Sequence, residues 1–313
     1  MPYLPQLLQE LLKDIDAQAP LEEIRIRAGM PVQLCFSGYE RLLYGHGGGA
    51  VADEDLCGEL LGKICEQSIY AWENELRGGF VTLPGGYRVG ICGRVEMRNN
   101  QVERFSHATS FCIRIAREIR GAAVAWAPYL RDGGAKLMST LILSPPGCGK
   151  TTLLRDLARV VSSGGYGICP GKVCMVDTRY ELAGAVRGVP QLDVGPRTDV
   201  LSGIPKALGM RMLVSNLAPD VLITDELSSQ EDIDAAMDAV ACGVTVAASA
   251  HATGCGTLAG RQLFTQMMQQ RLFERIVILG RSHGTGTVEQ ILDGSLRKIY
   301  GEEKQCNAQL PCS

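Results

Sequence analysis

The stretch LILSPPGCGKTTLLRDL, residues 141–157, decides the fold. It begins with an apolar run typical of a buried strand, continues through a glycine-rich turn to Lys-Thr, and ends in a segment with helical character. This order of strand, loop and helix is the context that a phosphate-binding P-loop requires. We therefore predict that the stretch binds the phosphates of a nucleotide, against the alternative of an ordinary glycine-rich turn.

Each part of the loop has a chemical role in this prediction. Gly147 and Gly149 let the backbone curl so that N–H groups and the helix N-terminus point at the phosphates. Lys150 reaches the β- and γ-phosphates of ATP, and Thr151 supplies a hydroxyl to Mg²⁺. Ser144 stands where this motif usually has its first glycine, and we interpret it as a tolerated substitution. The predicted nucleotide-binding residues are Ser144, Pro145, Pro146, Gly147, Cys148, Gly149, Lys150, Thr151 and Thr152.

A second motif lies some seventy residues downstream, where an apolar strand, residues 221–223, is followed by Thr-Asp-Glu. A carboxylate at a strand end beside a P-loop holds Mg²⁺, and we assign this role to Asp225 together with Thr151. Glu226 is then placed to polarise the attacking water. The alternative is that both acids lead into the next helix, whose start Ser228-Ser229-Gln230-Glu231 has the pattern of a capping box.

Two weaker signals follow other expected strands. Asp177 and Glu181 come after the strand that ends at Val176, and His251 comes after the run 247–250. If these two strands flank the P-loop strand, their tips lie near the γ-phosphate, where an acid orients water and an imidazole senses the phosphate. The alternatives are a solvated loop and a hydrogen-bonded histidine, and spacing alone favours the second for His251.

Apolar runs separated by helices surround these motifs and predict a parallel sheet covered on both faces. The runs are residues 141–143, 173–176, 221–223, 244–248 and 276–279. Ligands of open α/β sheets bind at the C-terminal ends of the strands. The chemistry is therefore expected at that edge.

The first 115 residues or so show a different pattern. Residues 23–27 alternate as a half-buried strand, and residues 54–76 predict a helix. A hairpin is expected around Pro84-Gly85-Gly86, between strands 80–83 and 87–91, and a further strand at 111–115. The fold class is therefore α/β, a mostly parallel P-loop domain preceded by a smaller mixed α/β domain. The expected boundaries are residues 1–118 for the first domain, 119–136 for a linker, 137–300 for the P-loop domain and 301–313 for a tail.

Composition narrows the function. The 313 residues include 31 Lys and Arg against 34 Asp and Glu, a net charge of -3, so the general basic excess of nucleic-acid-binding proteins is missing. No segment approaches the roughly 18 apolar residues of a membrane span. The twelve cysteines have no CxxC pair and no zinc-site spacing. We expect a cytoplasmic protein, any membrane role of which is peripheral, and no nucleic acid as partner.

The order of the motifs resembles the ATPases of type II and type IV secretion systems. It includes the P-loop, the Asp177–Glu181 segment, the run from Arg211 to Asp220, the Asp225-Glu226 pair and His251-Ala252. The chain resembles still more closely the stage III sporulation AA family of endospore-forming bacteria. That match extends over nearly the whole chain and also includes residues 23–27, 86–90 and 113–118.

The resemblance implies a RecA-like core that binds ATP and Mg²⁺ and forms a homo-hexameric ring. It also implies that membrane proteins of a sporulation secretion-like complex are partners. Secretion ATPases commonly have Gly-Glu where this chain has Asp225-Glu226, so the choice of general base stays open between Glu226 and Glu181. A sibling family carries a nucleic-acid-binding module with an Arg-x-x-x-His motif, whose spacing Arg281-Ser282-His283 does not match.

In such rings, arginines from the N-terminal domain or linker reach the nucleotide of a neighbouring subunit. The candidate here is Arg114, because its neighbours Ile113 and Ile115 would be buried while Arg114 faces the other way. The alternative is a salt bridge within the domain, for example with Glu118.

The favoured hypothesis is a ring-forming ATPase that energises a secretion-like channel. Two alternatives remain open at this stage: a nucleotide-dependent nucleic-acid-binding protein, and a scaffold that binds ATP without turnover. Charge balance and the resemblance favour the first over the second.

Overall fold

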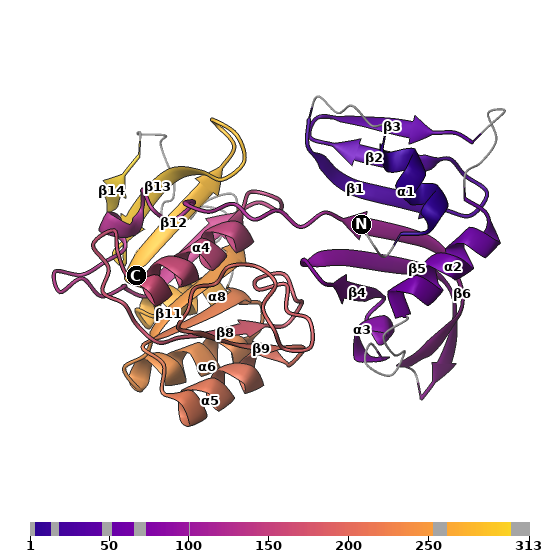
Figure 1. Cartoon of the computed structure of the whole chain (residues 1–313). Helices are drawn as coiled ribbons and strands as arrows, with labels where there is room; N and C mark the ends of the chain where they lie inside the picture. Colours follow the sequence, from indigo (N-terminus) through magenta and orange to yellow (C-terminus); the bar gives the residue numbers. More distant parts are fainter. Residues whose placement is uncertain are drawn as a thin grey trace. The chain divides into compact units, whose positions relative to one another are not determined.

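The computed structural model describes residues 4–13, 19–45, 52–65, 73–99, 101–252 and 262–301. The chain divides into two compact units, residues 1–117 and 118–313, each with its own sheet (Figure 1). Apart from Gly301, the expected tail lies outside the described residues.

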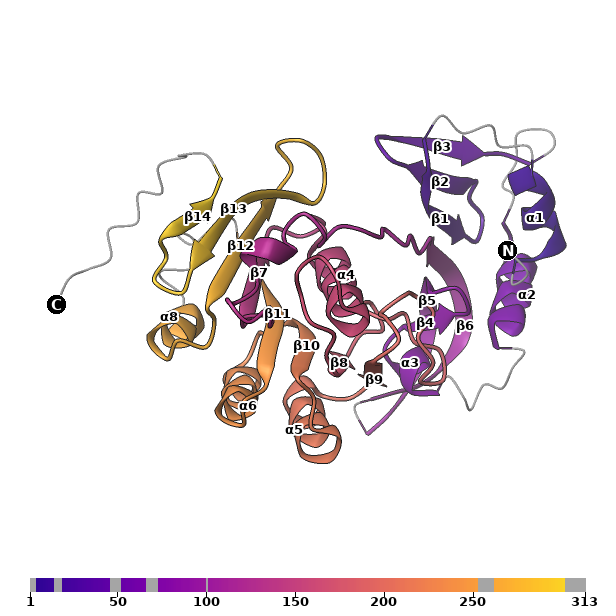
Figure 2. The same cartoon turned by 60° about the vertical axis from the view of Figure 1, so that its left-hand side comes forward.

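The first unit is built on a six-stranded antiparallel sheet with the strand order β3-β2-β1-β6-β5-β4. Figure 2 shows α1 and α2 together on one side of this sheet. The strands are β1 (Leu21–Arg27), β2 (Val32–Phe36), β3 (Tyr39–Leu43), β4 (Phe80–Leu83), β5 (Tyr87–Arg98) and β6 (Gln101–Arg114). The helices are α1 (Gln6–Lys13), α2 (Glu54–Cys65) and α3 (Glu73–Arg77).

The alternation that predicted β1 is confirmed, because Ile24 and Ile26 are buried while Glu23, Arg25 and Arg27 stay partly exposed. The expected hairpin is also present. Gly85 and Gly86 adopt φ of 87° and 78° between β4 and β5, a conformation that glycine reaches without a steric penalty. The helix predicted at 54–76 appears as α2 and α3, and residues 66–72 lie outside the described part of the chain.

The second unit contains an eight-stranded sheet with the order β14-β13-β12-β7-β11-β10-β8-β9. All neighbours from β12 to β9 are parallel, and β13 and β14 add an antiparallel edge. The strands are β7 (Thr140–Ser144), β8 (Val173–Asp177), β9 (Thr198–Ser202), β10 (Val221–Glu226), β11 (Thr245–His251), β12 (Arg275–Gly280), β13 (Thr287–Asp293) and β14 (Lys298–Tyr300). The helices are α4 (Lys150–Ser163), α5 (Lys206–Leu217), α6 (Gln230–Ala241), α8 (Gln262–Gln269) and the 3-10 helix η3 (Ala127–Tyr129).

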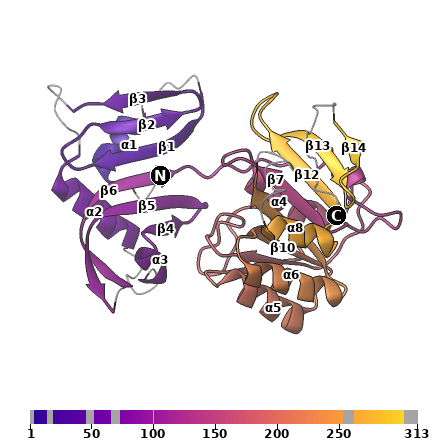
Figure 3. The same cartoon turned by 180° about the vertical axis from the view of Figure 1, so that it is seen from behind.

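Helices cover both faces of this sheet, as the apolar runs predicted. Figure 2 shows α4 on one face and α5, α6 and α8 on the other, and Figure 3 shows the latter face from the front. Each face has its own core. Leu154 and Ile142 belong to the core under α4, whereas Leu141 and Ile233 belong to the opposite one. The fully buried strands explain why the runs lack alternation.

Two expectations about this unit are wrong. The strand that precedes Asp177 does not flank the P-loop strand, because β7 lies between β11 and β12, and β8 is separated from it by β11 and β10. The expected linker, residues 119–136, is part of the second unit. Ala123, Ala127 and Leu130 from this segment are fully buried in the core under α4, so it is packed chain rather than a flexible connection.

Candidate functional site

The P-loop connects β7 to α4 and has the backbone that binds anions. Gly147 and Gly149 have φ of 69° and 88°, in the left-handed region where a side chain would be strained. Gly149 is the N-cap of α4, and no side chain caps the first N–H groups of that helix. Uncapped N–H groups and the positive end of the helix dipole make this turn a favourable position for phosphate.

Ser144 does not occupy a left-handed position. It is the last residue of β7, fully buried and paired with His251 of β11, so its backbone has strand geometry, which a side chain does not strain. Its hydroxyl donates to the Pro145 carbonyl at 2.7 Å and lies 3.3 Å from the Lys150 ammonium. The departure from glycine therefore leaves the strand geometry intact.

Lys150 is held inside the loop, with only 8% of its surface exposed. Its ammonium donates to the Ser144 carbonyl at 3.3 Å and to the Pro145 carbonyl at 3.4 Å, and it lies 2.8 Å from Nδ1 of His251. Burial lowers the pKa of this amine, and the negative charge of Glu226 acts in the opposite direction. The amine is therefore a desolvated cation, which interacts more strongly with an anion than a solvated one.

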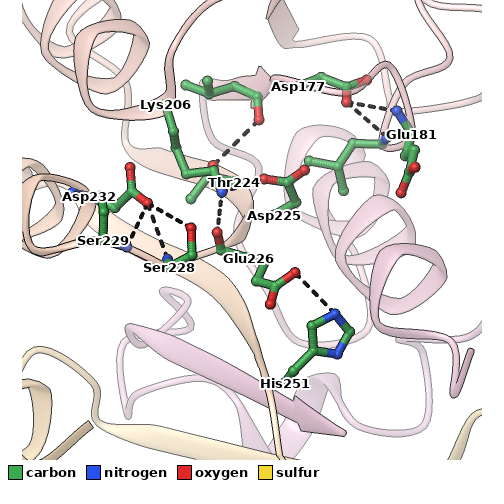
Figure 4. Close-up of polar contacts among 12 residues, drawn as sticks. Asp177, Glu181, Lys206, Thr224, Asp225, Glu226, Ser228, Ser229, Asp232 and His251 are labelled. Carbon is green, nitrogen blue, oxygen red and sulfur yellow. Dashed lines mark hydrogen bonds and ion pairs between the residues drawn. The ribbon is translucent and has the colours of Figure 1, made fainter. Parts of the chain in front are cut away.

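His251 joins Lys150 of the P-loop to Glu226 of the second motif, and Figure 4 shows its contact with Glu226. Its Nε2 lies 3.0 Å from Oε2 of Glu226, while its Nδ1 faces Lys150. With Lys150 as donor to Nδ1, the proton of the neutral ring is on Nε2 and is donated to Glu226. Glu226 and His251 end the neighbouring strands β10 and β11, and Lys150 is the first residue of α4, which follows the loop after β7. The carboxyl ends of these three strands meet at one edge of the sheet. The side chains of Glu226 and His251 are 35% and 38% exposed, so water can reach them.

Asp225 has a cationic partner that the sequence did not predict. The ammonium of Lys206 lies 2.7 Å from Oδ1 of Asp225 and also donates to the backbone carbonyl of Glu226. Both side chains are largely buried, with 11% of Lys206 and 15% of Asp225 exposed. Lys206 begins α5, which no motif marks, so only the folded chain reveals this pair.

Asp177 serves its own loop. Its carboxylate is fully buried and accepts backbone N–H groups of Glu181 at 2.8 Å, Leu182 at 3.1 Å and Ala183 at 2.8 Å. Burial raises the pKa of this carboxyl, and the three hydrogen bonds oppose the rise. The loop is tied to the P-loop helix, because Arg155 of α4 donates to the Glu181 carbonyl at 2.7 Å. Asp177 thus fixes the backbone of Glu181. It does not lie on a strand adjacent to the P-loop strand.

The capping box after β10 is shifted by one residue from the expected one. Ser229 is the N-cap of α6 and accepts from the N–H of Asp232, whose carboxylate accepts from the Ser229 N–H in return. Asp232 also accepts the N–H of Ser228 at 3.1 Å. The start of α6 is therefore stabilised by Ser229 and Asp232, and neither Asp225 nor Glu226 is needed to cap it.

The connection between β12 and β13 forms a further wall of the P-loop. A guanidinium nitrogen of Arg281 donates to the carbonyls of Pro146 at 3.4 Å and Gly147 at 3.2 Å. A Cβ on Gly149 would lie 3.3 Å from Cα of Gly286. The Arg281-Ser282-His283 run thus has a structural place beside the loop.

The remaining P-loop residues take positions that the motif implies. Cys148 is buried, and its thiol lies 3.8 Å from the Pro146 carbonyl. Thr151 and Thr152 are half-buried in the first turn of α4.

Arg114 lies at the end of β6 in the first unit. Its guanidinium is 59% exposed and forms an ion pair with Glu23 of β1 at 3.3 Å. Burial raises the pKa of Glu23, but Arg25 and Arg114 outweigh it and the net shift is downward. The salt bridge within the domain is therefore present, with Glu23 as the partner. Glu118, the partner first considered, lies in the second unit and accepts the N–H of Asp193.

Among the described residues, no helix has both the length and the apolar character to cross a membrane. In the same part of the chain, no three His, Cys, Asp or Glu side chains are grouped as a metal site.

Comparisons with known proteins match nearly the whole chain. The family model described as "Sporulation stage III, protein AA" matches residues 4–299. The Stage III sporulation protein AA of Bacillus subtilis (strain 168) is 41% identical over 292 residues, 93% of this chain and 93% of that protein.

Two solved structures share the fold. The pilus retraction motor PilT with bound ADP has a TM-score of 0.57 at 16% identity, over 88% of this chain and 78% of that chain. The ATPase DotB of Legionella pneumophila has a TM-score of 0.53 at 14% identity, over 82% of this chain and 72% of that one. The chain therefore has the same RecA-like P-loop fold as these two proteins.

Proposed function

The chain belongs to the sporulation stage III protein AA family, and we propose that it is a Mg²⁺-dependent ATPase that works as a ring-forming motor. Its partners would be membrane proteins of a secretion-like complex during sporulation, with the ATPase on the cytoplasmic side. The observation that carries the proposal is the contact chain from Lys150 through His251 to Glu226. Two proteins of the same fold, the pilus retraction motor PilT with bound ADP and the ATPase DotB, support the proposal.

The P-loop residues fit a nucleotide. The uncapped N-terminus of α4 and the left-handed glycines at 147 and 149 form a cradle of N–H groups for phosphate oxygens. Lys150 would supply the cation for the β- and γ-phosphates. Its present acceptors are neutral carbonyls, a hydroxyl and an imidazole, all weaker partners than a phosphate.

Asp225 and Thr151 fit a magnesium ion. Asp225 already has a cation within 2.7 Å, the ammonium of Lys206, so this largely buried carboxylate lies where positive charge is stabilised. Thr151 sits in the first turn of the P-loop helix. The metal, when bound with ATP, would neutralise charge that develops on the phosphates.

Glu226 is our candidate for the general base. Its side chain is partly exposed and oriented by His251, so it can accept a proton from water. His251 contacts both Glu226 and Lys150, and a phosphate that draws Lys150 away would change the hydrogen bonds of the imidazole. Through this contact, His251 would couple occupancy of the P-loop to the position of the base. Glu181 is the second candidate, on the loop that Asp177 fixes.

The ring proposal assigns a role in trans to Arg114. Its side chain is exposed at the end of a strand, and the partly exposed carboxylate of Glu23 is its ion-pair partner. An exposed ion pair of this kind contributes about 0–1 kcal/mol, so it can be exchanged for a stronger anionic partner. An arginine supplied by a neighbour to a transferring phosphate contributes about 10³-fold or more in rate.

Subunit mixing tests the ATPase and the ring together. We expect Mg²⁺-dependent ATP hydrolysis by the wild type and none by Lys150→Ala or Arg114→Ala alone. In mixed assemblies, an intact Arg114 from a Lys150→Ala subunit would serve the intact P-loop of an Arg114→Ala subunit. Hydrolysis should therefore return in proportion to such interfaces, while light scattering with a slowly hydrolysed ATP analogue reports assembly.

The outcomes separate the parts of the proposal. Absence of hydrolysis by the assembled wild type contradicts the ATPase and favours a scaffold that binds ATP. Stimulation by single-stranded DNA favours the nucleic-acid-binding alternative. Mixed assemblies that form without regaining activity contradict the role of Arg114 alone. Arg104→Ala is a matched control, because Arg104 is an exposed arginine of the same strand paired with Glu96.

A further inference from the structure

A cavity of about 530 Å³ lies in the second unit. Its walls come from the segment before η3, from the connection after β12, from β13 and from the end of β14. The lining residues that matter here are Trp126, His283, Gly286, Val288, Gln290 and Tyr300. The volume lies in the range of roughly 300–1,000 Å³ that is typical of small-molecule sites.

The cavity adjoins the P-loop through a shared wall. Gly286 lines the cavity, and its Cα lies 3.3 Å from the position that a Cβ on Gly149 would occupy. Arg281, at the start of the same connection, donates to the carbonyls of Pro146 and Gly147. The turn is held in shape, because the Thr287 hydroxyl donates to the Gly284 carbonyl at 2.7 Å. The connection thus passes from the phosphate loop directly into the cavity wall.

Aromatic rings form the far side of the cavity. The rings of Trp126 and Tyr300 lie 5.0 Å apart at 65°, and Tyr129 lies 5.5 Å from Tyr300. Tyr300 is 37% exposed and Trp126 is half-buried, so ring surface remains open to a ligand. Such rings offer a stacking surface for planar groups.

We propose that this cavity is the nucleobase site, and that it prefers purines. The inference rests on the proposed function, because the P-loop accounts for the phosphates of a bound nucleotide and the nucleoside needs a site of its own. The shared Gly149–Gly286 wall puts the cavity next to those phosphates. Purines are preferred because two fused rings cover more of the Trp126 and Tyr300 surface than one ring does.

Tryptophan fluorescence provides a direct test. The chain has two tryptophans, Trp72 and Trp126, and Trp72 lies outside the described residues. In a Trp72→Phe protein, all tryptophan emission comes from Trp126. With Mg²⁺ present, ATP and GTP should change this emission, whereas tripolyphosphate, which has no base, should bind without changing it.

Affinities complete the test. Tyr300→Ala should raise the dissociation constant for ATP about tenfold, the loss expected from one base-stacking contact. Its tripolyphosphate constant should stay within twofold of the wild type. Trp126→Phe, which keeps a ring, should lose less than Trp126→Ala. Tyr166→Ala is the matched control, because Tyr166 is 53% exposed and belongs to the same unit but does not line the cavity.

Two results would overturn the inference. Emission of Trp126 that stays unchanged while calorimetry shows bound ATP places the base elsewhere, as does equal weakening of ATP and tripolyphosphate by Tyr300→Ala. In both cases tripolyphosphate binding that depends on Lys150 shows that the P-loop still works. If neither ligand binds the wild type, the proposed function fails and the base site fails with it.

Discussion

Two strand tips at the same edge of the second sheet present acids in different ways. At the tip of β8, Asp177 is fully buried and its oxygens accept three backbone N–H groups. At the tip of β10, Glu226 is about one third exposed and contacts the imidazole of His251, which contacts Lys150. Figure 4 shows Asp177 turned to its own loop and Glu226 turned to His251.

The difference shows that an acidic residue at the carboxyl end of a buried strand can have either of two roles. A carboxylate surrounded by N–H donors is a structural acceptor, and burial keeps water away from it. A carboxylate that reaches solvent and faces an imidazole can exchange protons. Burial and the number of N–H donors, rather than residue type, distinguish the structural carboxylate from the one that exchanges protons. Mutations of these residues test the distinction.

The largest effect is expected from Glu226→Gln. The amide cannot accept a proton, whereas Lys150, Thr151 and Asp225 remain, so ATP should bind with nearly the wild-type affinity. The hydrolysis rate should fall by about 10²–10⁴-fold, the usual contribution of a general base. Single-turnover hydrolysis and binding of ATP, measured on the same preparation, check this.

Glu181→Gln is the matched control, because it makes the same chemical change on the neighbouring loop. We expect a smaller loss of rate. Wild-type turnover by Glu226→Gln together with a loss in Glu181→Gln would exchange their roles, and the contact between His251 and Glu226 would then be structural.

The sequence predicted the parts of this site that depend on local pattern. The P-loop, the strand that ends in Asp225-Glu226 and the strand that ends at His251 are continuous segments whose apolar runs and breaks are visible in order along the chain. It could not predict the lateral order of the strands, since buried parallel strands have similar compositions and any of them could lie beside β7. For this reason the sequence could not show that two strands, β11 and β10, separate the strand of Asp177 from β7.

Contacts between distant segments were also beyond the sequence. Lys206 contacts Asp225 only because α5 and β10 pack together, and Arg281 reaches the P-loop only because β12 pairs with β7. The strands β2, β3, β9, β13 and β14 were not predicted. β9 and β3 are only partly buried, so the apolar signal that marks the central strands is weak there.

A smaller effect, on stability rather than rate, is expected from Asp177→Asn. The substituted amide presents an NH₂ group to donors that need an acceptor, and buried N–H groups lose a partner. The free energy of unfolding should fall by about 1–3 kcal/mol. Urea unfolding measures this, and Asp199→Asn, at an exposed acid of β9, should change the same quantity by less than about 0.5 kcal/mol.

Hydrolysis by Asp177→Asn, measured where the protein is folded, separates the two uses of an acid. We expect a rate much closer to the wild type than that of Glu226→Gln, since Asp177 acts by holding Glu181 in place. A loss as large as that of Glu226→Gln, with unchanged stability, would contradict the structural role.

The smallest effect is expected from Ser144→Gly, at the tip of β7. Because Ser144 has strand geometry, glycine offers no conformational advantage there, and the change removes a hydroxyl that lies 3.3 Å from the Lys150 ammonium. Lys150 keeps the backbone carbonyls of residues 144 and 145 as acceptors. The dissociation constant for an ATP analogue should therefore change by less than about threefold, whereas a loss of about 1.4 kcal/mol in binding free energy would change it tenfold. Ser144→Ala removes the hydroxyl and keeps the Cβ. A loss of tenfold or more in both variants would show that the hydroxyl helps to place Lys150, whereas a loss in Ser144→Gly alone would point to the flexibility that glycine adds to the strand end.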